Sequence, residues 1–487
     1  MSQQNNKQRS YWVKSGLLTI LQRLSVLVFG LGSLFLMLRA MSKADFGTWA
    51  LFLAVISFLE VGRNGLIQNA LVRFMAACGI EDKEEYAKIS TASLFINVSL
   101  TLLSMLLLFI CAKPLSVLWN APDLMVMFPI YAATTALLLP FFHFNCVQQA
   151  NFTFTGIFWS SFVKQGLFFL YVLFVYTMGF ELTLINLCLV QIGTAIFGGL
   201  TAYYFARPYV FFAKKVDEQW VKRLFNYGKF VFGTNLSAML YKSIDKVMLG
   251  FVSPAFVAVY DLAIRINNLI EVPTFSIATI VFPKGAQQMK TEGKPAMKRL
   301  YEKSVGTILA LIIPCVVFIL LFPELIITIL AGEKYLDAVG ILQLTVLYGL
   351  FIPFANQFGT VLDAMGKPKI NFRFVILGAG LNILTNYCFI FILQYGLIGA
   401  AYGTLCTYGI MFVLNQWVLY KELNVNVLNV FPNMIQAYIE GFKMAKELYV
   451  KHLQPHFNKP PQNHLPTNTT TNRTSSKPIL PKREMTV

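Results

Sequence analysis

Long apolar segments constrain this chain more than any other feature of its sequence. Twelve of them lie between residues 17 and 420, and short polar stretches separate them. An α-helix needs about 20 apolar residues to cross the roughly 30 Å of hydrocarbon in a bilayer. The pattern therefore predicts an all-α integral membrane protein with spans at 17–38, 47–70, 89–111, 124–147, 156–178, 183–206, 229–250, 256–280, 304–330, 338–362, 371–394 and 396–420.

The composition argues against nucleic-acid binding, which a high positive net charge usually suggests. The 487 residues are 56% hydrophobic and only 13% charged, yet the formal net charge is +17. In a soluble chain this charge would suggest nucleic-acid binding, but here the basic residues occupy the short gaps between apolar segments. We expect no nucleic-acid partner, and membrane lipids are the expected surroundings.

The distribution of Lys and Arg predicts the orientation. The connections on one side of the twelve spans, with both termini, hold 30 of these residues, and the opposite connections hold four. Cytoplasmic loops carry such an excess, so both termini are predicted to be cytoplasmic. The first apolar segment is too long for a signal peptide and is expected to remain as the first span.

An internal repeat divides the chain. At an offset of 211 residues, segment 46–61 runs beside segment 257–272, matching Trp49 to Tyr260 and Glu60 to Glu271. We expect two parallel six-helix repeats around a central cavity, where a transporter would bind its substrate. The predicted parts are a cytoplasmic N-terminus (1–15), an N-terminal six-helix lobe (16–206), a basic cytoplasmic linker (207–228), a C-terminal six-helix lobe (229–422), an amphipathic cytoplasmic segment (423–451) and a disordered cytoplasmic tail (452–487).

Ionisable residues inside the spans are the candidates for function, because they are costly in hydrocarbon and usually face a cavity or a partner. Six cations and four anions leave a surplus of +2, which favours an anionic substrate. The candidate substrate-binding cations are Arg23, Arg63, Lys164, Lys242 and Arg265, and the candidate coupling or ion-pair acids are Glu60, Asp245, Asp261 and Glu271; the sixth cation is Lys246.

Helical spacing offers an alternative for these residues. Asp261 and Arg265 are four apart, Lys242 and Asp245 are three apart, and so are Glu60 and Arg63, which permits neutralisation within one helix. We expect structural pairing for the acids and a cavity-lining role for Arg23 and Arg265. Lys164 fits either a cavity or snorkelling to the interface equally well.

Motifs for catalysis are missing from the sequence. It contains no Walker A, HExxH or GxSxG pattern, and its seven cysteines are scattered singly through apolar segments. We therefore predict that the chain is not an enzyme and uses no cofactor or metal.

Five short motifs carry a resemblance to a known family. They are residues 38–51 (LRAMSKADFGTWAL), 245–250 (DKVMLG) with 259–265 (VYDLAIR), 322–325 (FPEL), 332–335 (GEKY) and 395–401 (YGLIGAA). In this order the chain resembles the polysaccharide exporters and O-antigen flippases of the multidrug/oligosaccharidyl-lipid/polysaccharide (MOP) superfamily. The resemblance implies a MATE-like fold in the bacterial cytoplasmic membrane. It also implies a flippase that moves undecaprenyl-diphosphate-linked oligosaccharide outward through a cationic cavity, with polysaccharide-synthesis enzymes as possible partners.

Alternative functions remain open at this point. A cation-coupled multidrug exporter of the same fold should have acids rather than bases in its cavity. A membrane scaffold for a polysaccharide-synthesis complex has no need of costly charges inside its spans. A peptidoglycan-precursor flippase, a relative usually built with more spans, is disfavoured by the predicted count of twelve.

Overall fold

The computed structural model describes the backbone of residues 2–452 and most side chains between Leu18 and Lys443. It is all-α, with no strand in this range, as predicted. The helices are α1 (Ser2–Ala40), α2 (Lys43–Cys78), α3 (Lys83–Leu118), α4 (Leu124–Ala150), α5 (Phe154–Thr177), α6 (Leu184–Ala206), η1 (Arg207–Tyr209), α7 (Glu218–Gly250), α8 (Pro254–Thr291), α9 (Lys294–Leu321), α10 (Pro323–Ala331), η2 (Glu333–Ala338), α11 (Val339–Gly349), α12 (Ile352–Ala364), α13 (Pro368–Tyr387), η3 (Cys388–Ile392), α14 (Gly396–Leu423), η4 (Val427–Asn429) and α15 (Val430–His452).

Most of the long helices are also apolar enough to cross a membrane. By length and composition, ten helical segments of the described residues could cross a bilayer, and one of them runs through η2, α11 and α12. The prediction of a multi-pass membrane protein is confirmed. The predicted seventh and eighth spans are the long helices α7 and α8, which are not among the ten and which carry intramembrane charges. A total of twelve spans therefore stays a prediction.

Two predicted spans are interrupted in the structure. The span predicted at 304–330 divides into α9 and α10 at Pro323, and the span at 338–362 divides into α11 and α12, with Pro353 in the first turn of α12. Proline lacks the backbone N–H that a helix interior requires but fits a first turn, where that donor has no partner. Both prolines therefore begin a new helix instead of continuing the previous one.

The structure describes parts of the predicted linker, amphipathic segment and tail. The second half of the predicted linker (207–228) is helical, because α7 begins at Glu218, where the carboxylate of Asp217 accepts from the amides of Gln219 and Trp220. Helix α15 occupies most of the predicted amphipathic segment (423–451). The predicted tail (452–487) lies outside the described residues except for His452.

Helix boundaries follow the spacing of the sequence repeat. Helices α2 and α8 begin 211 residues apart, at Lys43 and Pro254, and each follows a serine at its N-cap. Helices α3 and α9 also begin 211 residues apart, at Lys83 and Lys294. These spacings support a repeat, while the two-repeat arrangement itself stays a prediction.

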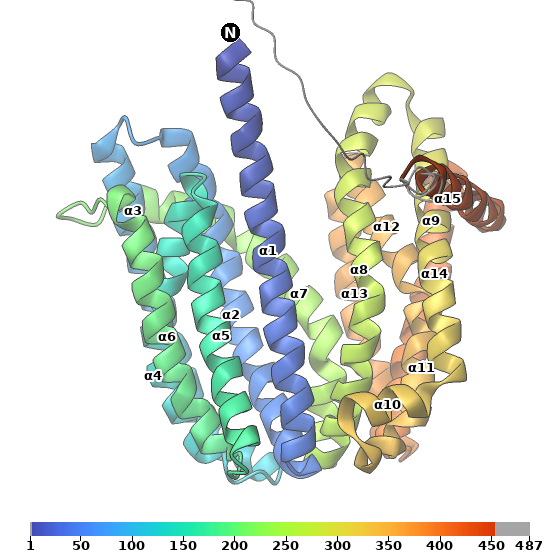
Figure 1. Ribbon diagram of the computed structural model, residues 1–487, viewed down its shortest axis with the longest axis horizontal. Coiled ribbons are helices and arrows are strands. Elements are labelled where there is room, and N and C mark those ends of the chain that lie inside the picture. The colour runs from blue at the N-terminus through green and yellow to red at the C-terminus, as the bar shows by residue number, and fades with distance from the viewer. Residues whose placement is uncertain (1, 453–487) are drawn as a thin grey trace, which may run out of the picture. The chain divides into compact units, whose positions relative to one another are not determined.

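The chain divides into two compact units, Met1–Ile435 and Gln436–Val487, and the first unit contains α1–α14. In that unit α1 and α3–α6 pack mainly on helices of the N-terminal half and form, with α2, the N-terminal lobe, whereas α7–α14 form the C-terminal lobe (Figure 1). Helix α2 packs against both α7 and α8 and so joins the lobes. Gly47 of α2 lies so close to α8 that a Cβ atom there would collide with the carbonyl oxygen of Pro254.

A second contact between the lobes lies where α1 meets α2. The Lys43 ammonium is 2.5 Å from the Asp337 carboxylate. Lys334 donates to the backbone oxygen of Met41 at 2.6 Å, and Arg39 donates to the backbone oxygen of Ile329 at 2.9 Å. We call these three interactions the outer latch, because the Lys and Arg asymmetry predicts that this end faces outward.

Candidate functional site

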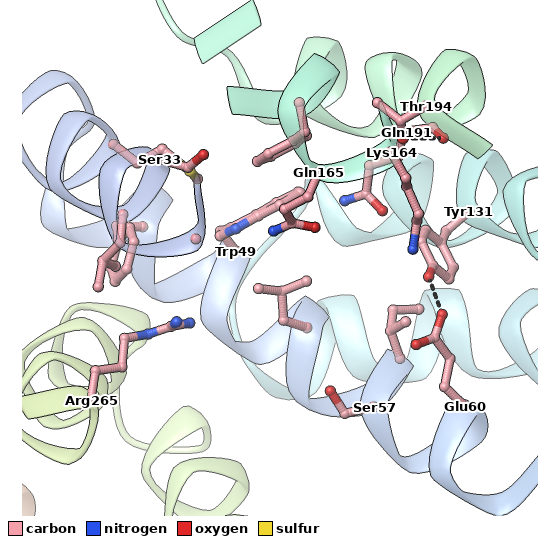
Figure 2. Close-up of a pocket in the computed structure, with 17 residues that line it drawn as sticks. Ser33, Trp49, Ser57, Glu60, Tyr131, Lys164, Gln165, Gln191, Thr194 and Arg265 are labelled. Carbon is pink, nitrogen blue, oxygen red and sulfur yellow. Dashed lines mark hydrogen bonds between the residues drawn. The ribbon is translucent and has the colours of Figure 1, made fainter. Parts of the chain in front are cut away.

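A polar cavity of about 260 Å³ lies within the N-terminal lobe and forms the first part of the candidate site (Figure 2). Helices α1, α2, α4, α5 and α6 supply almost all of its lining, and Arg265 of α8 is the contribution from the other lobe. Besides Arg265, its polar lining consists of Ser33, Ser57, Glu60, Tyr131, Lys164, Gln165, Gln191 and Thr194, together with the indole of Trp49. We call this space the N-lobe cavity.

Lys164 is the cation of α5 in this cavity. Figure 2 shows its ammonium group directed toward Tyr131 and Glu60. The Tyr131 hydroxyl donates to the Glu60 carboxylate at 2.7 Å. Within the described part of the chain Lys164 has no hydrogen-bond or ion-pair partner, and its ammonium lies 5.1 Å from the centre of the Phe141 ring. A half-buried ammonium without a carboxylate partner is available to an anion that enters the cavity.

Arg63 and Arg23 lie outside the N-lobe cavity. Arg63 is 3% exposed, sits 4.4 Å from the centre of the Phe142 ring and reaches the Thr101 hydroxyl at 3.5 Å. Its Nε and one Nη have no hydrogen-bond partner among the described residues. Arg23 is exposed on α1. Their predicted role in binding substrate stays a prediction.

A second polar cavity, also about 260 Å³, lies in the C-terminal lobe and is lined by α7, α8, α11 and α14. Its cations differ from Lys164, because each has an acidic partner. Lys242 contacts Glu271 at 2.8 Å, and this pair joins α7 to α8. The Asp245 carboxylate accepts from the Tyr260 hydroxyl at 2.6 Å.

Asp261 is the centre of a three-residue ion cluster. One of its carboxylate oxygens is 2.5 Å from the Lys246 ammonium, and the other is 2.5 Å from Nε of Arg265. The Asp261 side chain is 2% exposed, whereas that of Arg265 is 35% exposed and lines the N-lobe cavity. Arg265 therefore combines the two roles considered from the sequence: it pairs within its helix and faces a cavity.

Two of the spacings that permit intrahelical pairs do not produce them. Lys242 pairs with α8 instead of with Asp245 three residues along, and Glu60 bonds to Tyr131 instead of to Arg63. Only the Asp261 and Arg265 spacing forms an intrahelical pair. In the other cases a partner on a neighbouring helix lies closer to the charged atoms than the residue one turn away.

Sequence reasoning also missed the neutral polar lining of the N-lobe cavity. The cost of a charge in hydrocarbon marks only ionisable side chains, so it does not point to the neutral residues Tyr131, Gln165, Gln191 and Thr194. Two glutamines within predicted apolar spans were the available signal.

Two apolar spaces adjoin the N-lobe cavity through shared lining residues. A small space of about 80 Å³ between α1, α8 and α10 shares Leu34 and Arg265 with the cavity. It shares Ile266, Leu269 and Leu330 with an apolar groove of about 450 Å³ on α8, α9 and α10. An apolar space and an apolar groove thus adjoin the polar cavity on the side of Arg265.

These features define a class of protein: a multi-pass helical membrane protein with a charged cavity in each of two lobes. Residues 36–340 match the model of the family described as polysaccharide biosynthesis protein, and the chain belongs to that family. The family resemblance noted in the sequence is confirmed.

Curated relatives match about half of the chain. It is 28% identical over 252 residues to an uncharacterized membrane protein of Methanocaldococcus jannaschii, covering 51% of this chain and 48% of the relative. It is 24% identical over 213 residues to the Probable low-salt glycan biosynthesis flippase Agl15 of Haloferax volcanii, covering 44% and 45%. It is 25% identical over 230 residues to the Teichuronic acid biosynthesis protein TuaB of Bacillus subtilis, covering 46% of each. The chain therefore spans about half the length of these relatives.

Solved structures share the fold. An inward-facing MATE family multidrug transporter of the MOP superfamily aligns with a TM-score of 0.67 at 16% identity, covering 81% of this chain and 95% of the transporter. The lipid II flippase MurJ aligns with a TM-score of 0.66 at 16% identity, covering 90% and 93%. The predicted MATE-like fold class is confirmed. Flippases and transporters of this kind are not enzymes, as the sequence predicts for this chain.

Proposed function

We propose that this protein is a flippase for undecaprenyl-diphosphate-linked oligosaccharide, acting in the bacterial cytoplasmic membrane with both termini in the cytoplasm. The observation that carries the proposal is Lys164, a cation that lines the N-lobe cavity and forms no ion pair with any described residue. The family and the relative named as a glycan biosynthesis flippase support the substrate class.

Charge favours a diphosphate over a cationic drug. In the C-lobe cavity and the adjoining cluster, Lys242, Lys246 and Arg265 each contact a carboxylate, so the cations there are already compensated. The surplus of positive charge therefore belongs to the N-terminal lobe. A diphosphate loses its hydration on entering the membrane, and charge-assisted hydrogen bonds from Lys164 and Arg265 would replace part of it.

The adjoining apolar space and groove favour a lipid-linked substrate over a free sugar phosphate. A polyprenyl chain cannot stay in a polar cavity without losing contact with hydrocarbon. The space between α1, α8 and α10 would offer the polyprenyl chain an apolar surface beside Arg265, and the apolar groove on α8, α9 and α10 adjoins that space. The head group would then occupy the cavity while the lipid tail remains in apolar surroundings.

Transport also requires the cavity to open to each side in turn. The outer latch holds α1 and α2 to the α10–η2 region, and it must open before the substrate leaves on the outer side. No nucleotide-binding motif is present in the sequence, so we expect the energy to come from an ion gradient or from removal of the product.

The test is a flipping assay in proteoliposomes with undecaprenyl diphosphate that carries one fluorescent sugar. Externally added quencher measures how much of the probe changes leaflet with time. Lys164→Gln should slow flipping by about 10- to 100-fold, the equivalent of one lost charge-assisted hydrogen bond of about 1.5–3 kcal/mol. Lys290→Gln is the matched control, because Lys290 is an exposed lysine outside both cavities.

The same vesicles separate the alternatives. Transport of a cationic dye without movement of the lipid probe would support the multidrug exporter. Equal flipping by Lys164→Gln and wild type, with equal folded protein by size-exclusion chromatography, would remove Lys164 from substrate binding. Absence of flipping in correctly folded wild-type protein would favour a scaffold in complex with polysaccharide-synthesis enzymes.

A further inference from the structure

A polar groove separate from the two cavities lies at the start of α3. It has a volume of about 810 Å³ and is formed by the first turns of α3 and the non-helical residues 210–217 that precede α7. Both segments lie at the same end of the N-terminal lobe (Figure 1). The lining includes four lysines: Lys83, Lys88, Lys214 and Lys215. We call it the lysine groove.

Specific contacts hold the loop side of the groove in place. The Ala213 amide donates to the Thr91 hydroxyl of α3 at 2.8 Å. Phe211 packs edge-on against Tyr86 with ring centres 6.1 Å apart, and Phe212 stacks on His143 with ring centres 6.0 Å apart. Because the loop contacts its neighbours at three successive residues, Lys214 and Lys215, which follow directly, lie in the same groove as the first turns of α3.

The charge of the groove is not fully compensated. Lys88 contacts Glu84 at 2.7 Å, and Asp217 caps α7. Lys214 and Lys215 are exposed and have no acidic partner among the described residues. Four cations against Glu84 and Asp217 leave a net charge of +2 in the lining, which suits a phosphate group.

Apolar side chains at the same place indicate a lipid instead of a dissolved anion. Phe212 is 47% exposed and Val216 is 42% exposed, although both line the groove. The third predicted span begins at residue 89, so the groove lies where the membrane surface should meet the protein. The Lys and Arg asymmetry predicts that this side is cytoplasmic, where anionic lipids give the membrane a negative surface potential.

We propose that the lysine groove binds an anionic phospholipid, with its phosphate between α3 and the two lysines of the loop and its acyl chains beside Phe212 and Val216. This site is separate from the N-lobe cavity and does not depend on the flippase activity. Its effect would be to fix the connection between the lobes at the membrane surface, because residues 210–217 lead directly into α7, which packs on α2.

The experiment titrates phosphatidylglycerol with a fluorescent acyl chain into the full-length protein in detergent. Phosphatidylcholine with the same fluorophore is the uncharged reference. Wild type should prefer phosphatidylglycerol, and added salt should weaken its binding. Lys214→Gln/Lys215→Gln should weaken it by about 30-fold, which corresponds to about 2 kcal/mol for two lysines at about 1 kcal/mol each. Both side chains are exposed, so the variant should remain folded.

A control variant and a competitor make the result decisive. Lys290→Gln/Lys298→Gln removes two lysines from the other lobe and should bind as wild type does. An equal loss in this control would show a general charge effect and overturn the proposal. Unchanged binding by Lys214→Gln/Lys215→Gln would also overturn it. Displacement of the lipid probe by inorganic diphosphate as effectively as by unlabelled phosphatidylglycerol would identify a soluble-phosphate site and refute the lipid assignment.

Discussion

The Asp261 cluster gives a quantitative prediction about stability. Asp261→Asn removes the partner of both Lys246 and Arg265, whereas Arg265→Ala leaves Asp261 paired with Lys246. Breaking a buried ion pair by removing one partner costs about 3–5 kcal/mol. Arg265 is 35% exposed, so its own contact with Asp261 should contribute only about 1 kcal/mol. We therefore expect Asp261→Asn to be several times more destabilising than Arg265→Ala.

Thermal unfolding in detergent measures this difference. A loss of 1 kcal/mol lowers the melting temperature of a unit of 150–250 residues by about 2–4 °C. If the C-terminal lobe unfolds as one unit, Asp261→Asn should melt about 10 °C below wild type and Arg265→Ala about 3 °C below. Glu292→Gln is the control, because it breaks an exposed pair with Arg299 and should change the melting temperature very little.

The outcome also bears on the role of Arg265. A well-folded Arg265→Ala protein that fails to flip the lipid probe would support contact with the substrate. If Arg265→Ala melts as low as Asp261→Asn, the reasoning is refuted, because Lys246 then does not compensate Asp261. Restored melting in the double variant Asp261→Ala/Arg265→Ala would then identify Arg265 as a structural partner.

Three further predictions concern the topology and the contacts between the lobes. Reporter fusions after Arg207 and after Gly332 should report opposite sides of the membrane, and the same side for both would contradict the predicted orientation. Gly47→Ala should reduce the folded yield, because its Cβ would collide with a backbone oxygen at the start of α8; wild-type yield and melting temperature would show that the helices separate easily. Lys43→Ala and Asp337→Ala should each speed opening of the outer side and be non-additive in a double-mutant cycle, measured by cysteine labelling at the latch, whereas additive effects would show that the two side chains act independently.

Local sequence was sufficient for the class of fold. Long apolar segments cannot remain in water, so their lengths and order predicted an all-α membrane protein before any contact between helices was known. Helix interruptions were less predictable, although Pro323 and Pro353 mark both of them. A proline inside a span permits a kink, a break or a new first turn, and packing decides among these.

The sequence also identified which charges are candidates for function, because a charge in hydrocarbon is costly wherever it lies along a span. It could not identify their partners. Spacing of three or four residues made Lys242 a candidate partner of Asp245 and Arg63 a candidate partner of Glu60, yet Lys242 and Glu60 interact with α8 and α4 instead. Such partners are distant in sequence, and only the packing of α7 on α8 and of α2 on α4 brings them together.

The sequence by itself determined the membrane-spanning helical architecture, the candidate charges and their net surplus, since these depend on composition and order alone. The tertiary structure alone decided where that surplus lies. It compensates the cations of the C-terminal lobe with Asp261 and Glu271. In the N-lobe cavity it bonds Glu60 to Tyr131 and leaves Lys164 without an ion-pair partner among the described residues. The physical reason is that the electrostatic environment of a side chain depends on the distance to every neighbouring charge, and those distances are set by how the helices pack.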